Sequence, residues 1–147
     1  MKIKKQRLKD TEAVKKERRG TMDKNLQENM PIYVQIMNKV REAIASGELA
    51  PGERVPAIRE LAAEFEVNPN TMQRALTELE REGLLLSRRT SGRFVTEDAE
   101  KIRCLKTELA EDAADKFKSE MARLGFTEQE IIDFFLKRCE KAERSVG

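Results

Sequence analysis

The sequence contains no histidine, and only two of its 147 residues are cysteines. The absence of histidine removes the commonest general base and the commonest metal ligand. Cys104 and Cys139 are far apart and lack a CxxC spacing, so we expect ordinary packing thiols, with a redox-sensing pair as the alternative. The chain also lacks a glycine-rich phosphate loop, a nucleophile elbow and clustered metal ligands. The sequence therefore predicts no enzyme, no metal and no cofactor.

Long apolar runs are missing as well. No stretch approaches the roughly 18 apolar residues that span a bilayer. The basic N-terminus has no apolar segment, so it does not resemble a secretory signal. Charged residues make up 38% of the chain and hydrophobic residues 39%, with a mean hydropathy of -0.67. We expect a helix-rich cytoplasmic protein with no membrane partner.

The net charge of +2 is spread unevenly along the chain. Residues 1–30 hold ten Lys/Arg and five Asp/Glu, so this basic extension carries +5 and the remainder -3. Three interpretations of the extension stay open: an arm that follows a phosphate backbone, a solvated tail, or sequence ahead of a true start at Met22. The last rests on Lys16–Gly20, which a purine-rich ribosome-binding stretch would encode.

The spacing of apolar residues predicts three helices before Gly83. The first begins at Pro31 and ends at Gly47, since proline suits a first turn and glycine a C-terminal cap. The second covers residues 56–65. The third follows Asn68, a plausible N-cap, and is closed by Gly83.

Two short strands are predicted next, at residues 84–87 and 93–96, around a basic turn that contains Gly92. A two-stranded hairpin is marginal in isolation. We therefore expect this hairpin to lie against the helices.

Residues 97–147 are predicted to form two long amphipathic helices. Gly125 separates them, and Thr127 and Glu130 form a capping box for the second. The second helix is apolar over so wide an arc that it needs two partners, namely the preceding helix and, we infer, a second subunit. The predicted homodimer interface consists of Leu105, Leu109, Phe117, Met121, Ile131, Ile132, Phe134, Phe135 and Leu136.

The third predicted helix has a polar outward face at its N-terminus. Its arginine suits guanine, and its asparagine and glutamine suit adenine. A solvated surface face is the alternative for this helix alone, but a basic hairpin directly after it is expected if both contact one duplex. Arg59 lies off the apolar stripe of the second helix. Its side chain is interpreted either as a phosphate or groove contact or as the partner of a nearby glutamate in a surface ion pair. The candidate contacts to double-stranded DNA are Arg59, Asn68, Asn70, Thr71, Gln73, Arg74, Arg88, Arg89, Thr90, Ser91, Gly92 and Arg93.

This ordered set resembles the GntR family of bacterial transcription regulators. Pro31–Ile36 resembles the family's opening helix, Gly47–Pro56 its turn, Arg59–Leu76 its helix-turn-helix and Gly92–Val95 its wing. The resemblance covers residues 31–96 without a gap. Two positions depart from the family pattern: Ala57 replaces a common serine, and Thr90 replaces the first wing glycine.

The resemblance implies a mainly α fold: a winged helix-turn-helix DNA-binding domain with a small β-hairpin wing, followed by a two-helix dimerisation segment. The short tail is similar to that of the YtrA subfamily, and a larger metabolite-binding domain would not fit. The implied function is a homodimeric repressor of a transporter-type or autoregulated operon that recognises an inverted-repeat operator. The alternative is a winged-helix protein-interaction module without a specific operator. The sequence identifies neither the operator nor any effector ligand.

Overall fold

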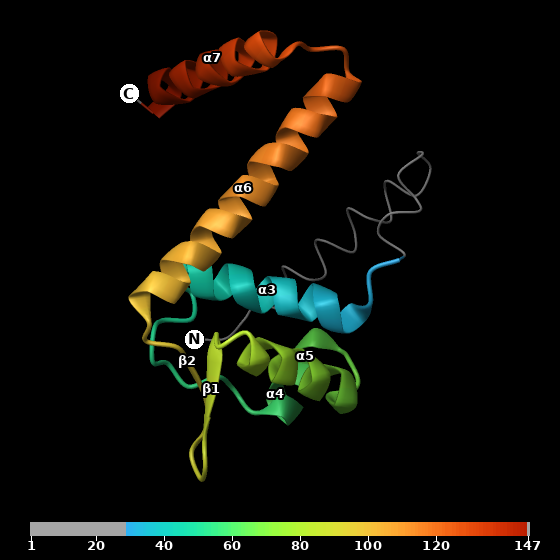
Figure 1. Ribbon diagram of the computed structural model, residues 1–147, viewed down its shortest axis with the longest axis vertical. Coiled ribbons are helices and arrows are strands. Elements are labelled where there is room, and N and C mark those ends of the chain that lie inside the picture. Colours follow the sequence, from blue (N-terminus) through green and yellow to red (C-terminus); the bar gives the residue numbers. More distant parts are fainter. Residues whose placement is uncertain (1–28, 147) are drawn as a thin grey trace. The chain divides into compact units, whose positions relative to one another are not determined.

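The computed structural model in Figure 1 describes residues 29–146. The chain divides into two compact units, Met1–Lys106 and Thr107–Gly147. The predicted basic extension falls almost wholly outside the described residues. Across residues 29–146, no helix is long and apolar enough to cross a membrane.

The first helix of the described chain, α3, covers Ile32–Ser46. Pro31 is its N-cap, so the helix starts one residue later than predicted. Gly47 ends it in the left-handed conformation, at a φ of 81° that favours glycine, and its N–H donates to the carbonyl of Ile44 at 3.2 Å. Its core face consists of Ile36, Met37, Val40, Ala43 and Ile44.

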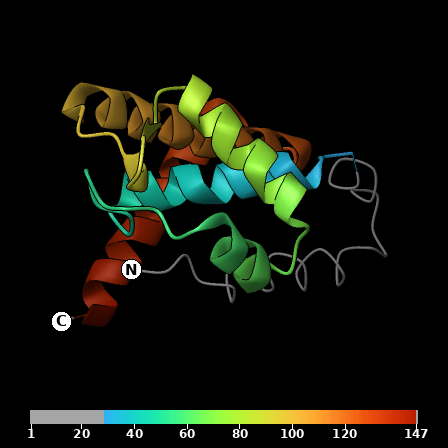
Figure 2. The ribbon, with the colours of Figure 1, turned by 90° about the horizontal axis from the view of Figure 1, so that it is seen from below.

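The helix-turn-helix consists of α4 (Ile58–Phe65) and α5 (Pro69–Arg81). The second predicted helix is wrong at its start, since Pro56 lies outside α4. The cap of α5 is confirmed, because the Asn68 side chain accepts a hydrogen bond of 2.8 Å from the N–H of Asn70. Figures 1 and 2 both show α5 lying against α3, which agrees with the contacts between these helices. The buried residues of α4 and α5 are Leu61, Ala62, Phe65, Met72, Ala75, Leu76 and Leu79.

The wing is an antiparallel hairpin of β1 (Leu85–Arg88) and β2 (Gly92–Val95). Each strand lies one residue closer to the tip than predicted. The pairing of Arg88 with Gly92 extends the ladder outward, while Leu84 and Thr96 join at its base by a single hydrogen bond of 2.9 Å.

The other edge of β2 is covered by residues 52–55, which the sequence analysis placed in a turn and its connection. Val55 donates its N–H to the carbonyl of Arg93 at 2.8 Å, and Val95 donates to the carbonyl of Glu53 at 2.9 Å. A bridge between Arg54 and Phe94 lies between these two bonds. The hairpin is therefore stabilised by backbone pairing on β2 as well as by the helices.

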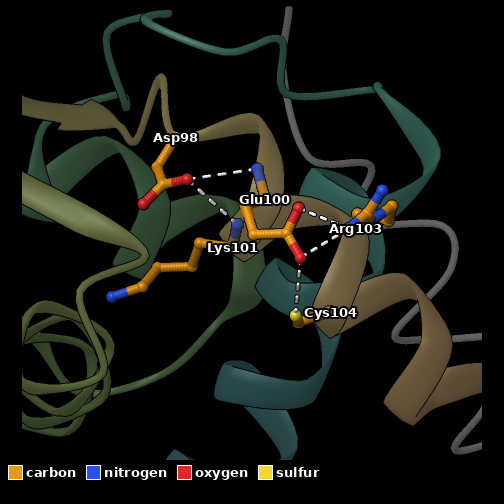
Figure 3. A network of polar contacts seen from close by, with 5 residues as sticks. All are labelled: Asp98, Glu100, Lys101, Arg103 and Cys104. Carbon is orange, nitrogen blue, oxygen red and sulfur yellow. Dashed lines mark hydrogen bonds and ion pairs between the residues drawn. The ribbon is translucent and has the colours of Figure 1, made fainter.

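Helix α6 (Ala99–Arg123) begins in the first unit and continues into the second. The Asp98 carboxylate caps it by accepting the N–H groups of Glu100 and Lys101, each at 3.1 Å (Figure 3). Lys101 also donates to the carbonyl of Glu82 at the end of α5, at 3.2 Å. The Lys101 bond thus joins the start of α6 to the end of α5 within the first unit. The predicted domain boundary at 96/97 lies ahead of this shared segment and stays a prediction.

Helix α7 (Glu128–Val146) completes the second unit. The predicted capping box is confirmed: Thr127 accepts from the N–H of Glu130 at 3.3 Å, and the Glu130 carboxylate accepts from the N–H of Thr127 at 3.1 Å. The rings of Phe117 and Phe135 lie 6.0 Å apart and join the two helices. Their contact places α7 against the C-terminal half of α6.

We expect Leu79→Ala to lower the free energy of unfolding by about 2–5 kcal/mol, because Leu79 is fully buried and its truncation leaves a cavity. Leu86→Ala is the control, since Leu86 is 47% exposed, and it should cost less than about 1 kcal/mol. Urea unfolding followed by circular dichroism measures both. Equal losses would contradict the burial of the inner face of α5.

Candidate nucleic-acid interface

The N-terminal half of α5 presents a polar face to solvent. Asn70, Gln73 and Arg74 are exposed there, and Thr71 is half-buried. Gln73 donates to the Thr77 hydroxyl one turn later at 3.3 Å, which holds its amide along the helix surface. The structure thus brings together three of the predicted base-contacting residues on one face. Asn68 lies beside them, with its side chain engaged in the helix cap.

Arg74 has a partner that the sequence analysis did not foresee. Its guanidinium lies 3.9 Å from the ring centroid of Tyr33, which comes from the first turn of α3. A cation over an aromatic face is attracted to the ring's negative quadrupole. The stack therefore links the N-terminal ends of α3 and α5 and restricts where the guanidinium can point.

The wing tip carries the second part of the predicted interface. Arg88, Arg89, Thr90, Ser91 and Gly92 are all exposed. The tip extends beyond the helices of its own unit, as Figure 1 shows. The N–H of Ser91 donates to the carbonyl of Arg88 at 3.1 Å, which closes the turn without the glycine usual at position 90.

Arg88 and Gly92 shape the two sides of this tip. The Arg88 guanidinium lies 4.7 Å from the ring centroid of Phe94, across the hairpin. Gly92 has a φ of 101°, a conformation that side chains rarely adopt. The tip is therefore a tight basic turn whose first arginine rests on the wing itself.

Arg93 differs from the other predicted wing contacts. Its side chain is only 19% exposed, and its Nε donates to the carboxylate of Glu80 on α5. The structure thus turns Arg93 toward α5. Strand alternation directs the Arg93 side chain to the inner face of the hairpin, and its assignment as a DNA contact stays a prediction.

Arg54 is a basic residue that the sequence analysis missed. It is exposed, and its side chain lies next to Gly92, where an added Cβ would come within 3.2 Å of the Arg54 Nε. The sequence does not reveal the position of Arg54, because residues 52–55 pair with β2, a strand almost forty residues later in the chain. Arg54 thus adds a cation beside the wing turn.

Arg59 is exposed in the first turn of α4, as the sequence predicted. Its assignment as a phosphate contact stays a prediction. Arg41, on α3, is instead engaged within the unit: its Nε donates to Glu82 at 3.0 Å, and its Nη1 to Asn38 at 2.9 Å.

The prediction of packing thiols is wrong for both cysteines, which are exposed. Cys104 lies on the polar side of α6, and its Sγ donates to the Glu100 carboxylate at 3.8 Å (Figure 3). The same carboxylate accepts from the Arg103 guanidinium at 2.6 Å. Neither thiol is among the buried hydrophobic residues, so the general tendency of cysteine to be buried gave the wrong expectation for both.

The predicted dimer-interface residues fall into three groups. Leu105, Met121 and Ile131 are buried within the single chain, so they have little surface left to offer a partner. Leu109 and Phe117 are half-buried. The exposed members are Ile132, Phe134, Phe135 and Leu136, which are 43–56% exposed. Leu124, directly after α6, is 73% exposed and is not among the predicted interface residues.

The exposed polar end of α5 beside a basic hairpin defines a winged helix-turn-helix protein. Residues 32–95 match the model of the gntR family of bacterial regulatory proteins. The HTH-type transcriptional regulator YhcF of Bacillus subtilis is 38% identical over 112 residues, covering 76% of this chain and 93% of its own. The repressor YtrA of the same organism is 37% identical over 94 residues, covering 64% and 68%.

A solved structure supports the same assignment. A GntR family transcriptional regulator from Listeria monocytogenes is 37% identical, with a TM-score of 0.68, over 74% of this chain and 96% of that chain. The chain belongs to the GntR family of DNA-binding transcriptional regulators. The predicted fold class is confirmed, and the family and fold are those of regulators rather than enzymes.

We expect Tyr33 and Arg74 to be energetically coupled, because the stack requires both the ring and the cation. A double-mutant cycle of Tyr33→Leu and Arg74→Met on the free energy of unfolding should give a coupling of about 0.5–1 kcal/mol. Tyr33→Phe keeps the ring and serves as the control, so the cycle of Tyr33→Phe with Arg74→Met should give a coupling close to zero. A coupling of zero for the native pair would contradict the stack.

Proposed function

We propose that this regulator is a homodimeric repressor that recognises an inverted-repeat operator through α5 and the wing. The observation that carries the proposal is the exposed face of Asn70, Gln73 and Arg74, next to a hairpin tip with Arg88 and Arg89. A helix end rich in bidentate hydrogen-bonding side chains suits the major groove. A basic tip suits the adjacent backbone.

Base contacts and backbone contacts divide between the two elements. Asn70, Gln73 and Arg74 would contact base edges and supply specificity. The wing arginines, with Arg54 and Arg59, would contact phosphates and supply affinity that falls with salt. The polar end of α5 is small, so one domain would contact only a few base pairs.

Dimerisation would extend the recognised sequence. The exposed apolar side chains of α7, including Ile132, Phe135 and Leu136, offer a surface for a second copy. Two domains related by a twofold axis would contact half-sites about 34–36 Å apart, in successive major grooves. An operator that overlaps a promoter would then be blocked.

The relatives support the proposal at the level of repression. The similar B. subtilis protein YtrA is described as a transcriptional repressor. By analogy with the family, we propose a transporter-type or autoregulated operon as the target and the bacterial cytoplasm as the location. No effector ligand is assigned.

Selection from a random-sequence DNA pool by the full-length chain tests the function. We expect enrichment of an inverted repeat that the chain binds more tightly than a random duplex of equal length. Equal affinity for both duplexes would instead favour the protein-interaction module. The selected duplex then serves as the probe for the variants below.

We expect Arg74→Ala to weaken binding of the selected duplex by roughly 1–3 kcal/mol and to relax base preference at one position per half-site. Arg81→Ala is the matched control, because Arg81 is an exposed arginine at the opposite end of the same helix, paired with Glu78 at 2.6 Å. Fluorescence anisotropy measures both affinities. An unchanged affinity for Arg74→Ala would exclude its role in base contact.

Phe135→Asp should separate the dimer, because it places a carboxylate among the exposed apolar side chains of α7. Lys137→Asp introduces the same carboxylate on the polar side of α7 and should leave the dimer intact. Sedimentation velocity gives the oligomeric state of each variant. A Phe135→Asp profile that still showed dimer would place the interface elsewhere.

A further inference from the structure

Glu80, in the last turn of α5, binds both strands of the wing through one carboxylate oxygen. Its Oε1 accepts from the Ser87 hydroxyl at 2.8 Å and from the Nε of Arg93. Ser87 and Arg93 stand directly opposite each other in the hairpin register. A single acceptor on α5 thus holds one complete rung of the wing.

The position of this rung is informative. Side chains alternate between the faces of a strand, so Ser87 and Arg93 share a face with Leu85 and Val95. Leu85 and Val95 are buried in the core. The inner face of the hairpin is therefore held by apolar packing at its base and by Glu80 one rung further out.

Beyond Glu80, the hairpin has one more residue pair and the turn. That outer segment includes the exposed arginines Arg88 and Arg89. A small rotation of the hairpin about its base would displace the tip most. Residues 52–55 hold β2 by backbone pairing, and the Glu80 side chain joins both strands to α5 at the outermost rung before the tip. The Glu80 contacts therefore bear directly on where the wing arginines lie relative to the polar end of α5.

We infer that Glu80 is a positioning residue for DNA binding, which holds the wing at the angle where its arginines and α5 contact the same duplex. This inference rests on the proposed function, because it requires the wing to contact DNA. The Glu80 carboxylate would thus favour DNA binding, although its negative charge by itself repels the DNA phosphates. The same carboxylate holds the Arg93 guanidinium on the inner face of the hairpin.

The direction of the change in DNA affinity in Glu80→Ala distinguishes a positioning role of Glu80 from a purely electrostatic one. Removing a negative charge near DNA strengthens binding by long-range attraction, and it would release Arg93 to contact phosphate. A loss of affinity in Glu80→Ala would run against both of these effects. Such a loss requires that the carboxylate positions other groups.

The test measures binding of the full-length chain to the duplex selected by the native protein. We expect Glu80→Ala to weaken binding by about tenfold, equivalent to about 1.4 kcal/mol. Glu80→Gln should lose less, since its amide oxygen still accepts from Ser87. Glu78→Ala is the matched control: Glu78 lies on the same helix and pairs with Arg81 rather than with a strand, so affinity should be unchanged.

A double-mutant cycle with Arg89→Ala identifies the route. If Glu80 acts through the wing, the loss caused by Glu80→Ala should be smaller once Arg89 is removed, because one of the two wing arginines that Glu80 positions is then absent. Thermal melts of each variant confirm that the measured protein is folded, and Glu80→Gln carries the test if Glu80→Ala does not fold.

Three results would overturn the inference. Affinity that is unchanged or increased in the folded Glu80 variants would leave Glu80 with a structural role only. Fully additive losses for Glu80→Ala and Arg89→Ala would exclude action through the wing. Failure of the native chain to enrich any duplex would overturn the proposed function itself, and the inference with it.

Discussion

Burial of one face of α5 is the constraint on which the rest of the first unit depends. The apolar residues from Met72 to Leu79 lie at helical spacing and are almost fully buried. Because the helix repeats every 3.6 residues, fixing this face in the core fixes the opposite face toward solvent. This geometry alone is enough to expose Asn70, Gln73 and Arg74. The stack on Tyr33 then restricts the direction of the Arg74 guanidinium.

Charge is arranged so that a domain without net charge can approach DNA. Residues 31–96 hold nine Lys/Arg and nine Asp/Glu. Three glutamates near the C-terminal end of α5, Glu78, Glu80 and Glu82, each pair with an arginine. These pairs offset much of the acidic charge at the C-terminal end of α5. The exposed arginines of the wing turn then form a local basic surface, which matters more to a nearby phosphate than the net charge does.

Local signals made most of the fold predictable. The N-cap at Asn68 and the capping box of Thr127 and Glu130 depend on residues within one helical turn, and both are confirmed. Non-local pairing was not predictable in the same way. The strip at 52–55 and the bond between Glu80 and Arg93 depend on how distant segments meet, so periodicity indicates which residue types face outward but not the partner of each.

The second unit leaves part of its apolar surface exposed. Within the second unit, Met121 and Ile131 are buried, whereas Ile132, Phe135 and Leu136 remain about half exposed. Water-exposed apolar side chains in such a group favour association. If a second copy of the chain covered this surface, each winged domain would have a tethered neighbour. The second domain would then bind its half-site at a high effective concentration. One weakly specific domain would thereby become a selective pair, and the exposed face of α7 would acquire a function that the isolated chain does not give it.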